Sequence, residues 1–177
     1  MKTLRVWFYD PASDSEGLIN KVVASIDRPF CHVELQFEDN RACSIYMGSA
    51  VALRARTFDS PNYQCLRLAC SDHQHTMAAG HAEHLHSKGL LFSSLQMTSC
   101  LLWAGGVPNP KQTFCSKLVT EILQQAGLVD AGIDAHSTSP SGLHRLLQAQ
   151  ALVVATVPPP PPPNLRTVAL DFRVRRP

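Results

Sequence analysis

The stretch "CHVELQF", residues 31–37, alternates apolar and polar side chains, a pattern typical of a β-strand with one packed face and one polar face. The apolar face carries Val33, Leu35 and Phe37, and the polar face carries His32, Glu34 and Gln36. The next residues, "EDNR", indicate a hairpin turn, and "ACSIYMGSAV" (42–51) provides the returning strand. The pattern leaves the register open, so either Ser44 or Ile45 shares the face of His32.

The segments around this hairpin alternate between strand and helix patterns. Short β-branched and aromatic runs predict further strands over 4–10, 63–70 and 151–157. Apolar residues at helical spacing predict helices over 15–27, 71–89, part of 90–107, about 114–126 and 139–150. Ser139 is expected to cap the last of these helices, with Pro140 at its first position. The chain therefore predicts an α+β fold in which an antiparallel sheet packs against helices.

A run of six prolines at 158–163 divides the chain. Such a run adopts an extended polyproline II conformation and cannot belong to a packed element. A chain of 177 residues is long enough for one compact domain. We therefore expect one domain over 1–157, followed by a polyproline segment and basic C-terminal tail over 158–177. The prolines can dock a proline-recognition domain or act as a spacer, and the spacer is favoured.

The composition narrows the class of protein. Hydrophobic residues make up 45% of the chain and charged residues 17%, against about 25% charged in average globular domains, so a folded chain is expected. A net charge of +2 without a broad basic cluster argues against nucleic-acid binding. No run reaches the roughly 18 apolar residues of a membrane span. The six cysteines are scattered through predicted core segments, which indicates free thiols in a reducing, cytoplasmic compartment.

Cys115 lies at the start of the amphipathic stretch "QTFCSKLVTEILQQAGL", residues 112–128. It shares a helical stripe with Leu118, Val119 and Ile122, which is typical of a small buried core residue. However, it also stands in the first turn of the predicted helix, where unpaired backbone N–H groups and the helix dipole favour a thiolate. The helix pattern alone leaves both interpretations open.

A cysteine nucleophile needs a base, and the helix itself offers none. Of the eight histidines, His32 is the best placed, because it lies on the polar face of a strand that has a strongly apolar opposite face. Glu34 follows on the same face, about 7 Å along the strand. It is either the third residue that orients the imidazole or a solvated carboxylate. Gln36 and Ser44 are the other candidates for the third position.

A second group of histidines lies on the predicted helix over 71–89, at positions 73, 75, 81, 84 and 86, close to Cys70. His81 and His84 stand three residues apart, a spacing that can chelate a metal ion. No histidine or cysteine pairs recur at zinc-finger spacing, so a solvated or partly buried helix face is favoured. We predict neither a metal site nor a cofactor.

The order of three segments resembles the circularly permuted branch of the NlpC/P60 superfamily of papain-like thiol hydrolases. In that branch a strand such as "CHVELQF" precedes a cysteine-bearing helix such as "FCSKLVTEILQQAGL". A "P-x-x-L" helix start commonly follows, which Pro140 and Leu143 match in "STSPSGLHRLL". The resemblance covers roughly residues 4–147, although only the two motif segments are specific.

The resemblance implies a permuted papain-like fold with Cys115 as nucleophile and His32 as general base. It implies a hydrolase that cleaves an amide bond, in a peptide, isopeptide or cell-wall peptide, or an ester bond. The third polar residue of the family usually lies on the strand after the histidine, where "ACSIYMG" offers only Ser44 and Tyr46. Accordingly, either Glu34 takes that role or Cys115 and His32 act as a dyad.

Two other functions stay open alongside this expectation. Lecithin:retinol acyltransferase-like enzymes share the histidine-then-cysteine order, which allows lipid acyl transfer or deacylation. Their cysteine usually stands in an "NCEHF"-type sequence, and "FCSKL" fits that branch less well. The chain can also be a catalytically inactive relative that binds a partner through its surface or its proline tail. Six prolines and a basic end suit a viral or eukaryotic setting, which would place the protein in a host cell or virion.

Overall fold

The computed structural model describes residues 1–11, 28–101, 109–150 and 153–157, and shows a mixed α+β fold. Its main sheet has six strands in the order β4-β3-β2-β1-β5-β8, and neighbouring strands pair antiparallel. The strands of this sheet are β1 (Lys2–Tyr9), β2 (His32–Gln36), β3 (Arg41–Ser44), β4 (Ala52–Ala55), β5 (Tyr63–Cys70) and β8 (Val153–Val157). A small parallel sheet joins β6 (Leu91–Phe92) to β7 (Gln112–Thr113).

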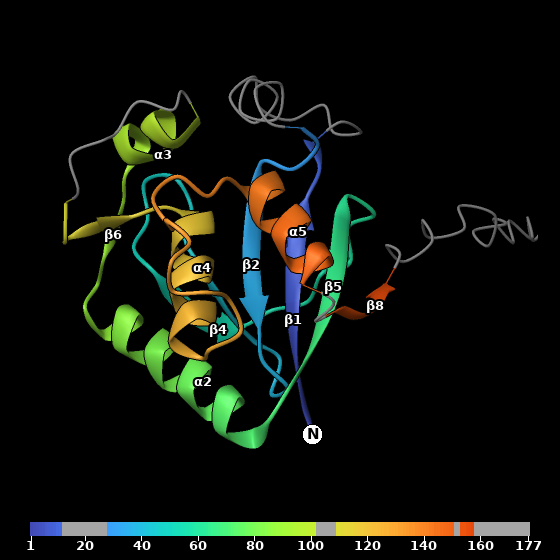
Figure 1. The fold of residues 1–177 in the computed structure, drawn as a ribbon. Coiled ribbons are helices and arrows are strands. Elements are labelled where there is room, and N and C mark those ends of the chain that lie inside the picture. Colours follow the sequence, from blue (N-terminus) through green and yellow to red (C-terminus); the bar gives the residue numbers. More distant parts are fainter. Residues whose placement is uncertain (12–27, 102–108, 151–152, 158–177) are drawn as a thin grey trace, which may run out of the picture.

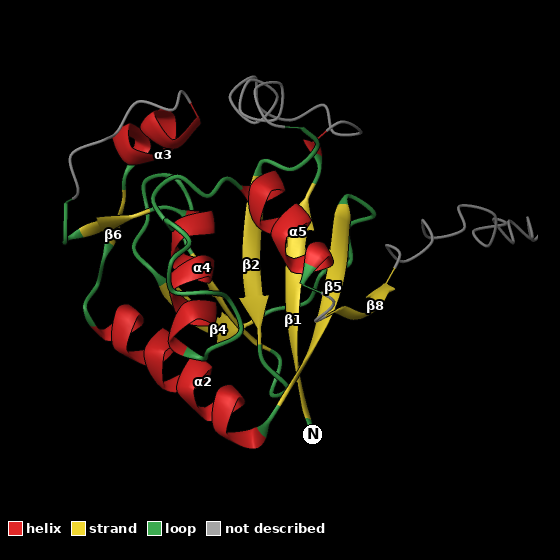
Figure 2. Cartoon of the chain, in the orientation of Figure 1, coloured by secondary structure: helices red, strands yellow, loops and turns green. Residues whose placement is uncertain are grey.

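Among the described residues, the helices are α2 (Asp72–Ser87), α3 (Ser94–Leu101), α4 (Cys115–Gln125) and α5 (Pro140–Ala149). Figure 1 shows α4 and α5 in front of the sheet and α2 across one end of it. Figure 2 shows the same arrangement by element type, with α3 set apart beside the small sheet. The predicted α+β fold, with an antiparallel sheet packed against helices, is confirmed at this level.

The hydrophobic core lies between these helices and one face of the sheet. Residues at every second position of β1 and β2 are buried there, because alternate side chains of a strand point to the same face. The core residues of these two strands include Leu4, Val6, Phe8, Val33 and Leu35. The helices contribute Ala78, Ala82, Leu118, Ile122, Leu143 and Leu147 to the same cluster. The opposite face of β1 and β2 therefore carries the polar positions of both strands.

The register of the hairpin decides which side chains share the face of His32. Leu35 pairs with Cys43 and Gln36 pairs with Ala42. Continuing this register places Ser44 opposite Glu34, so Ser44 and not Ile45 lies on the polar face. Asn40 has a φ of 63° in the connecting turn, a conformation that asparagine adopts more readily than most residues.

The helix boundaries follow the local signals in the sequence. Ser71 and Gln74 form a capping box at the start of α2. The Ser139 side chain accepts a hydrogen bond from the Gly142 backbone N–H, with Pro140 at the first helical position of α5. α4 ends before Gly127, which has a φ of 66°. The expected cap at Ser139, with Pro140 at the first helical position, is confirmed.

Some elements differ from the expectation or lie outside it. The sequence pattern did not predict β4, because "ALRA" has neither apolar alternation nor a buried face, and its strand geometry comes from pairing with β3. The predicted helix over 15–27 and the tail over 158–177 lie outside the described residues. The six cysteines are free thiols. Within the described ranges, no helix is long and apolar enough to cross a membrane.

Candidate active site

Cys115 is the first residue of α4, and its side chain is buried. The chain reaches it through β7, which pairs with β6 and so fixes the residues just before the helix. Phe114 takes the N-cap position in an extended conformation and supplies no side-chain hydrogen bond to the helix. The backbone N–H groups of the first turn therefore have no side-chain cap and can stabilise negative charge beside the sulfur.

His32 is the first residue of β2, and its side chain interacts with that of Cys115, which raises the pKa of the imidazole. In Figure 1, α4 begins at the end of the sheet where β2 also begins. The Nε2 atom of His32 lies 3.5 Å from Oε1 of Glu34. The imidazole also packs on Tyr46, with ring centroids 4.6 Å apart. The side chain is 14% exposed, so it is largely shielded from solvent.

Glu34 is fully buried, and the described polar groups around it converge on one carboxylate oxygen. Its Oε1 accepts hydrogen bonds from the Tyr46 hydroxyl at 2.5 Å and the Tyr63 hydroxyl at 3.3 Å. Arg56 Nη2 lies 3.1 Å from the same oxygen. Burial opposes ionisation, but His32, Tyr46 and Arg56 outweigh it and lower the pKa of Glu34. Glu34 is therefore a carboxylate that faces the imidazole.

The pKa of His32 reflects both of its polar neighbours. Burial alone would lower it, but hydrogen bonds and charge interactions with Cys115 and with Glu34 raise it to about 9. At neutral pH the ring is then predominantly an imidazolium, which faces the Glu34 carboxylate and the Cys115 sulfur.

The other two candidates for the third position do not contact His32 in the described structure. Gln36 accepts a hydrogen bond from Trp7 Nε1 at 2.9 Å and donates one to the Arg56 carbonyl at 2.9 Å. The Ser44 hydroxyl is buried without a hydrogen-bond partner. Of the residues singled out in the sequence, the structure brings together Cys115, His32 and Glu34.

Sequence reasoning missed two members of this cluster, Arg56 and Tyr63. Arg56 follows β4, and its guanidinium lies 5.0 Å from the centroid of the Phe58 ring and 2.9 Å from the Tyr63 hydroxyl. Tyr63 pairs with Tyr9 across β5 and β1. Only the pairing of distant strands brings these two side chains to Glu34, so no local pattern reveals them. Tyr46 was visible as a polar residue on the returning strand, without an assigned contact.

A neighbouring cysteine, Cys31, precedes His32 and packs against Tyr9 and Met97. Burial, with a smaller contribution from the charge of Cys115, raises the pKa of the Cys31 thiol to about 12. Cys31 therefore stays a thiol at neutral pH and does not compete as a nucleophile.

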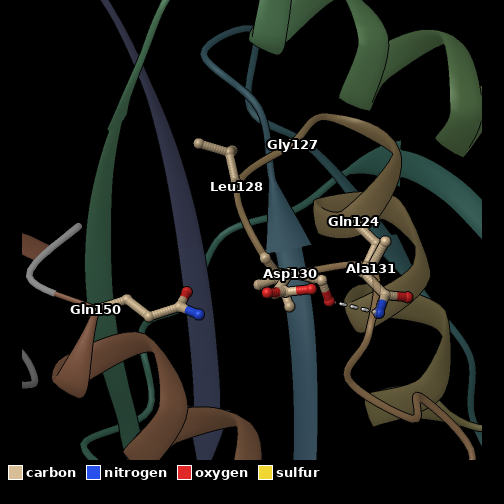
Figure 3. Close-up of a pocket in the computed structure, with 7 residues that line it drawn as sticks. Gln124, Gly127, Leu128, Asp130, Ala131 and Gln150 are labelled. Carbon is tan, nitrogen blue, oxygen red and sulfur yellow. Dashed lines mark hydrogen bonds between the residues drawn. The ribbon is translucent and has the colours of Figure 1, made fainter.

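An open pocket of about 490 Å³ lies at the other end of α4, beyond its last turn. Figure 3 shows Gln124 and Asp130 on one side of it and Gln150 on the other. Gln124 Nε2 donates to the carbonyls of Asp130 and Ile133. Cys115 and His32 do not line this pocket, so it is separate from the cluster at the start of the helix.

The second histidine group does not assemble a metal site. The rings of His81 and His84 lie 6.1 Å apart on α2. Within the described ranges, no three histidine, cysteine, aspartate or glutamate side chains are arranged to hold a metal ion.

The fold and this cluster define a mixed α+β protein with a buried cysteine–histidine–glutamate arrangement. No protein-family model matches the sequence, and no curated protein matches it significantly.

Proposed function

We propose that the chain is a cysteine hydrolase that cleaves an amide bond, in a peptide, isopeptide or cell-wall peptide, or an ester bond. The observation that carries the proposal is that His32 lies between two acidic groups, the Cys115 thiol at the start of α4, which interacts with its imidazole, and the buried Glu34 carboxylate, 3.5 Å from its Nε2. A thiol hydrolase uses a cysteine nucleophile, a histidine base and a carboxylate that orients the histidine. Cys115, His32 and Glu34 match these three parts.

The mechanism follows from these contacts. His32 holds the proton of Cys115, and the thiolate attacks the carbonyl carbon of the substrate. The uncapped N–H groups at the start of α4 stabilise the negative charge that develops on the carbonyl oxygen. His32 then gives its proton to the leaving amine or alcohol, which leaves an acyl group on the sulfur. Water, deprotonated by His32, attacks this thioester and releases the acid and the free enzyme.

The order of the elements supports placing the chain with the permuted NlpC/P60-like, papain-like hydrolases. The histidine strand β2 precedes the cysteine helix α4, and the α5 start at Pro140 follows. A free thiolate nucleophile works in a reducing compartment, so we place the protein in the cytoplasm, including that of a host cell if the source is viral.

A lipid acyltransferase or deacylase is the second candidate, and one surface feature favours it. The large hydrophobic side chains exposed in the described ranges are Met1, Met47, Leu91 and Leu95. Met47 follows Tyr46, which packs on His32, and Leu91 bridges to Ala50 in the same region. Exposed apolar side chains of this kind suit an acyl chain. Turnover of acyl esters that rises with chain length, without peptide cleavage, would select this function.

Labelling with a thiol-directed probe such as iodoacetamide tests the shared mechanism. We expect the wild type to be labelled rapidly at neutral pH on Cys115, and Cys115→Ala or His32→Ala to lose this rapid labelling while remaining folded by circular dichroism. Removing a general base or nucleophile typically costs about 10²-fold or more in rate.

Cys65→Ala is the matched control for this test. Cys65 is another buried cysteine, and burial raises its pKa to about 11. Its removal is expected to leave the rapid labelling unchanged. Equal labelling of the wild type, Cys115→Ala and His32→Ala would contradict the catalytic assignment and favour a binding protein.

A further inference from the structure

A second open pocket, of about 580 Å³, lies on the face of the sheet away from the helices. It is bounded by β1, β2 and the segment that follows β4. Arg5 and Trp7 line it and alternate with Leu4 and Val6, which pack under the helices. His32 and Cys115 do not line it, but Arg56 belongs both to this pocket and to the cluster around Glu34.

The first arginine of this pocket lacks an acidic partner among the described residues. Arg5 Nη1 donates only to the neutral side-chain oxygens of Gln36 and Asn40, each at a long 3.4 Å. On β5, Arg67 pairs directly with Arg5. Like charges at paired positions of an antiparallel sheet repel each other. An anion beside Arg5 would offset that repulsion.

The second arginine, Arg56, also lines the pocket, and its side chain is 25% exposed. Its Nη2 interacts with Glu34 and Tyr63. Asp59 is the acidic lining residue, and it is exposed and makes no ion pair with Arg5 or Arg56 within the described ranges.

The side chains that line the pocket are held in place by contacts with one another. Trp7 and Phe58 stack with ring centroids 4.4 Å apart and planes within 7°. The Gln36 side chain links this wall to Arg56, because its Oε1 accepts from Trp7 Nε1 and its Nε2 donates to the Arg56 carbonyl. A preformed pocket with few convergent polar groups is typical of a small-ligand site.

We propose that this pocket binds the carboxylate or phosphate group of a small ligand through the guanidinium groups of Arg5 and Arg56. Both arginines line one concave site, and oxyanions match guanidinium donors in charge and geometry. The proposal does not depend on the hydrolase activity.

Two-dimensional ¹⁵N NMR on the full chain provides the test, with inorganic phosphate and benzoate as separate probes at constant ionic strength. The tryptophans are Trp7 and Trp103, so a Trp103→Phe background leaves the Trp7 indole N–H as the reporter inside the pocket. We expect a saturable shift of this signal with at least one probe. The probe that binds more tightly identifies a phosphate or a carboxylate ligand.

Arg5→Gln should weaken binding by at least about tenfold, because it removes a charge-assisted hydrogen bond. Arg67→Gln is the matched control, since it removes the same charge from the paired position outside the pocket, and it should change affinity by no more than about twofold. Arg5→Lys keeps the positive charge but lacks the planar guanidinium group with its several N–H donors. It replaces Arg5→Gln if that variant does not fold. No saturable shift with either probe, or equal weakening in both glutamine variants, would overturn the proposal.

Discussion

Glu34 illustrates how a charge is kept inside this protein. A buried carboxylate is unfavourable unless it is paired and hydrogen-bonded. Here Arg56 supplies the positive charge, and the hydroxyls of Tyr46 and Tyr63 supply hydrogen bonds. With His32 as imidazolium, the positive charges of His32 and Arg56 surround the single negative charge of Glu34.

The pKa of His32 provides a direct test of this arrangement. Both Glu34 and Cys115 raise it to about 9, so Glu34→Gln and Cys115→Ala should each lower it. The imidazolium is then lost at a lower pH than in the wild type, and its fraction at pH 7 to 8 falls. Histidine-selective NMR titration measures this shift for the His32 ring.

Ser44→Ala serves as the control for this titration. Ser44 lies opposite Glu34 in the continued register, but its hydroxyl has no hydrogen-bond partner. Its removal should leave the pKa of His32 where it is. A His32 titration that is the same in the wild type and in Glu34→Gln would remove Glu34 from the proposed site.

At the scale of elements, alternation along one strand was enough to find two of the three site residues. The polar face of 31–37 placed His32 and Glu34 together, and helical spacing with an early cysteine located Cys115. These two patterns could not identify Arg56 and Tyr63. They reach Glu34 only through the order and register of β2, β3, β4 and β5, which are set by long-range packing and not by local pattern.

The turn between β3 and β4 positions Tyr46 over the cluster, and its glycine can be tested. The Tyr46 carbonyl accepts hydrogen bonds from the backbone and side chain of Ser49. Gly48 in this turn has a φ of 77°, and a Cβ there would meet nothing within 4 Å. Gly48→Ala should therefore lower the free energy of unfolding by about 1 kcal/mol, through backbone strain alone.

Gly80→Ala is the same substitution in the opposite setting. Gly80 is exposed in the interior of α2, has an ordinary helical backbone, and also has nothing within 4 Å of an added Cβ. Gly80→Ala should raise the free energy of unfolding by about 0.5 to 1 kcal/mol, because alanine has a higher helix propensity than glycine. Urea denaturation of both variants measures the two effects. Shifts of the same sign would contradict the backbone argument.

At the scale of the whole molecule, the main core and the candidate site belong to one continuous unit. The largest buried cluster runs from Leu4 to Leu147, and β8 adds the edge strand next to β5. The expected division after residue 157 stays a prediction, because residues 158–177 lie outside the described part of the chain. Its basis in the sequence is that six prolines cannot continue a strand.

Shortened chains test this division. A chain ending at Val157 should keep both the urea midpoint of the full chain and the rapid labelling of Cys115, since Cys115, His32, Glu34 and their described partners all precede that residue. A chain ending at Gln150 should be less stable, because β5 then loses the pairing of Cys65–Leu68 with β8 and becomes an exposed edge. If removing 158–177 alone abolished labelling, the tail would be part of the working site and the domain would have to extend beyond 157.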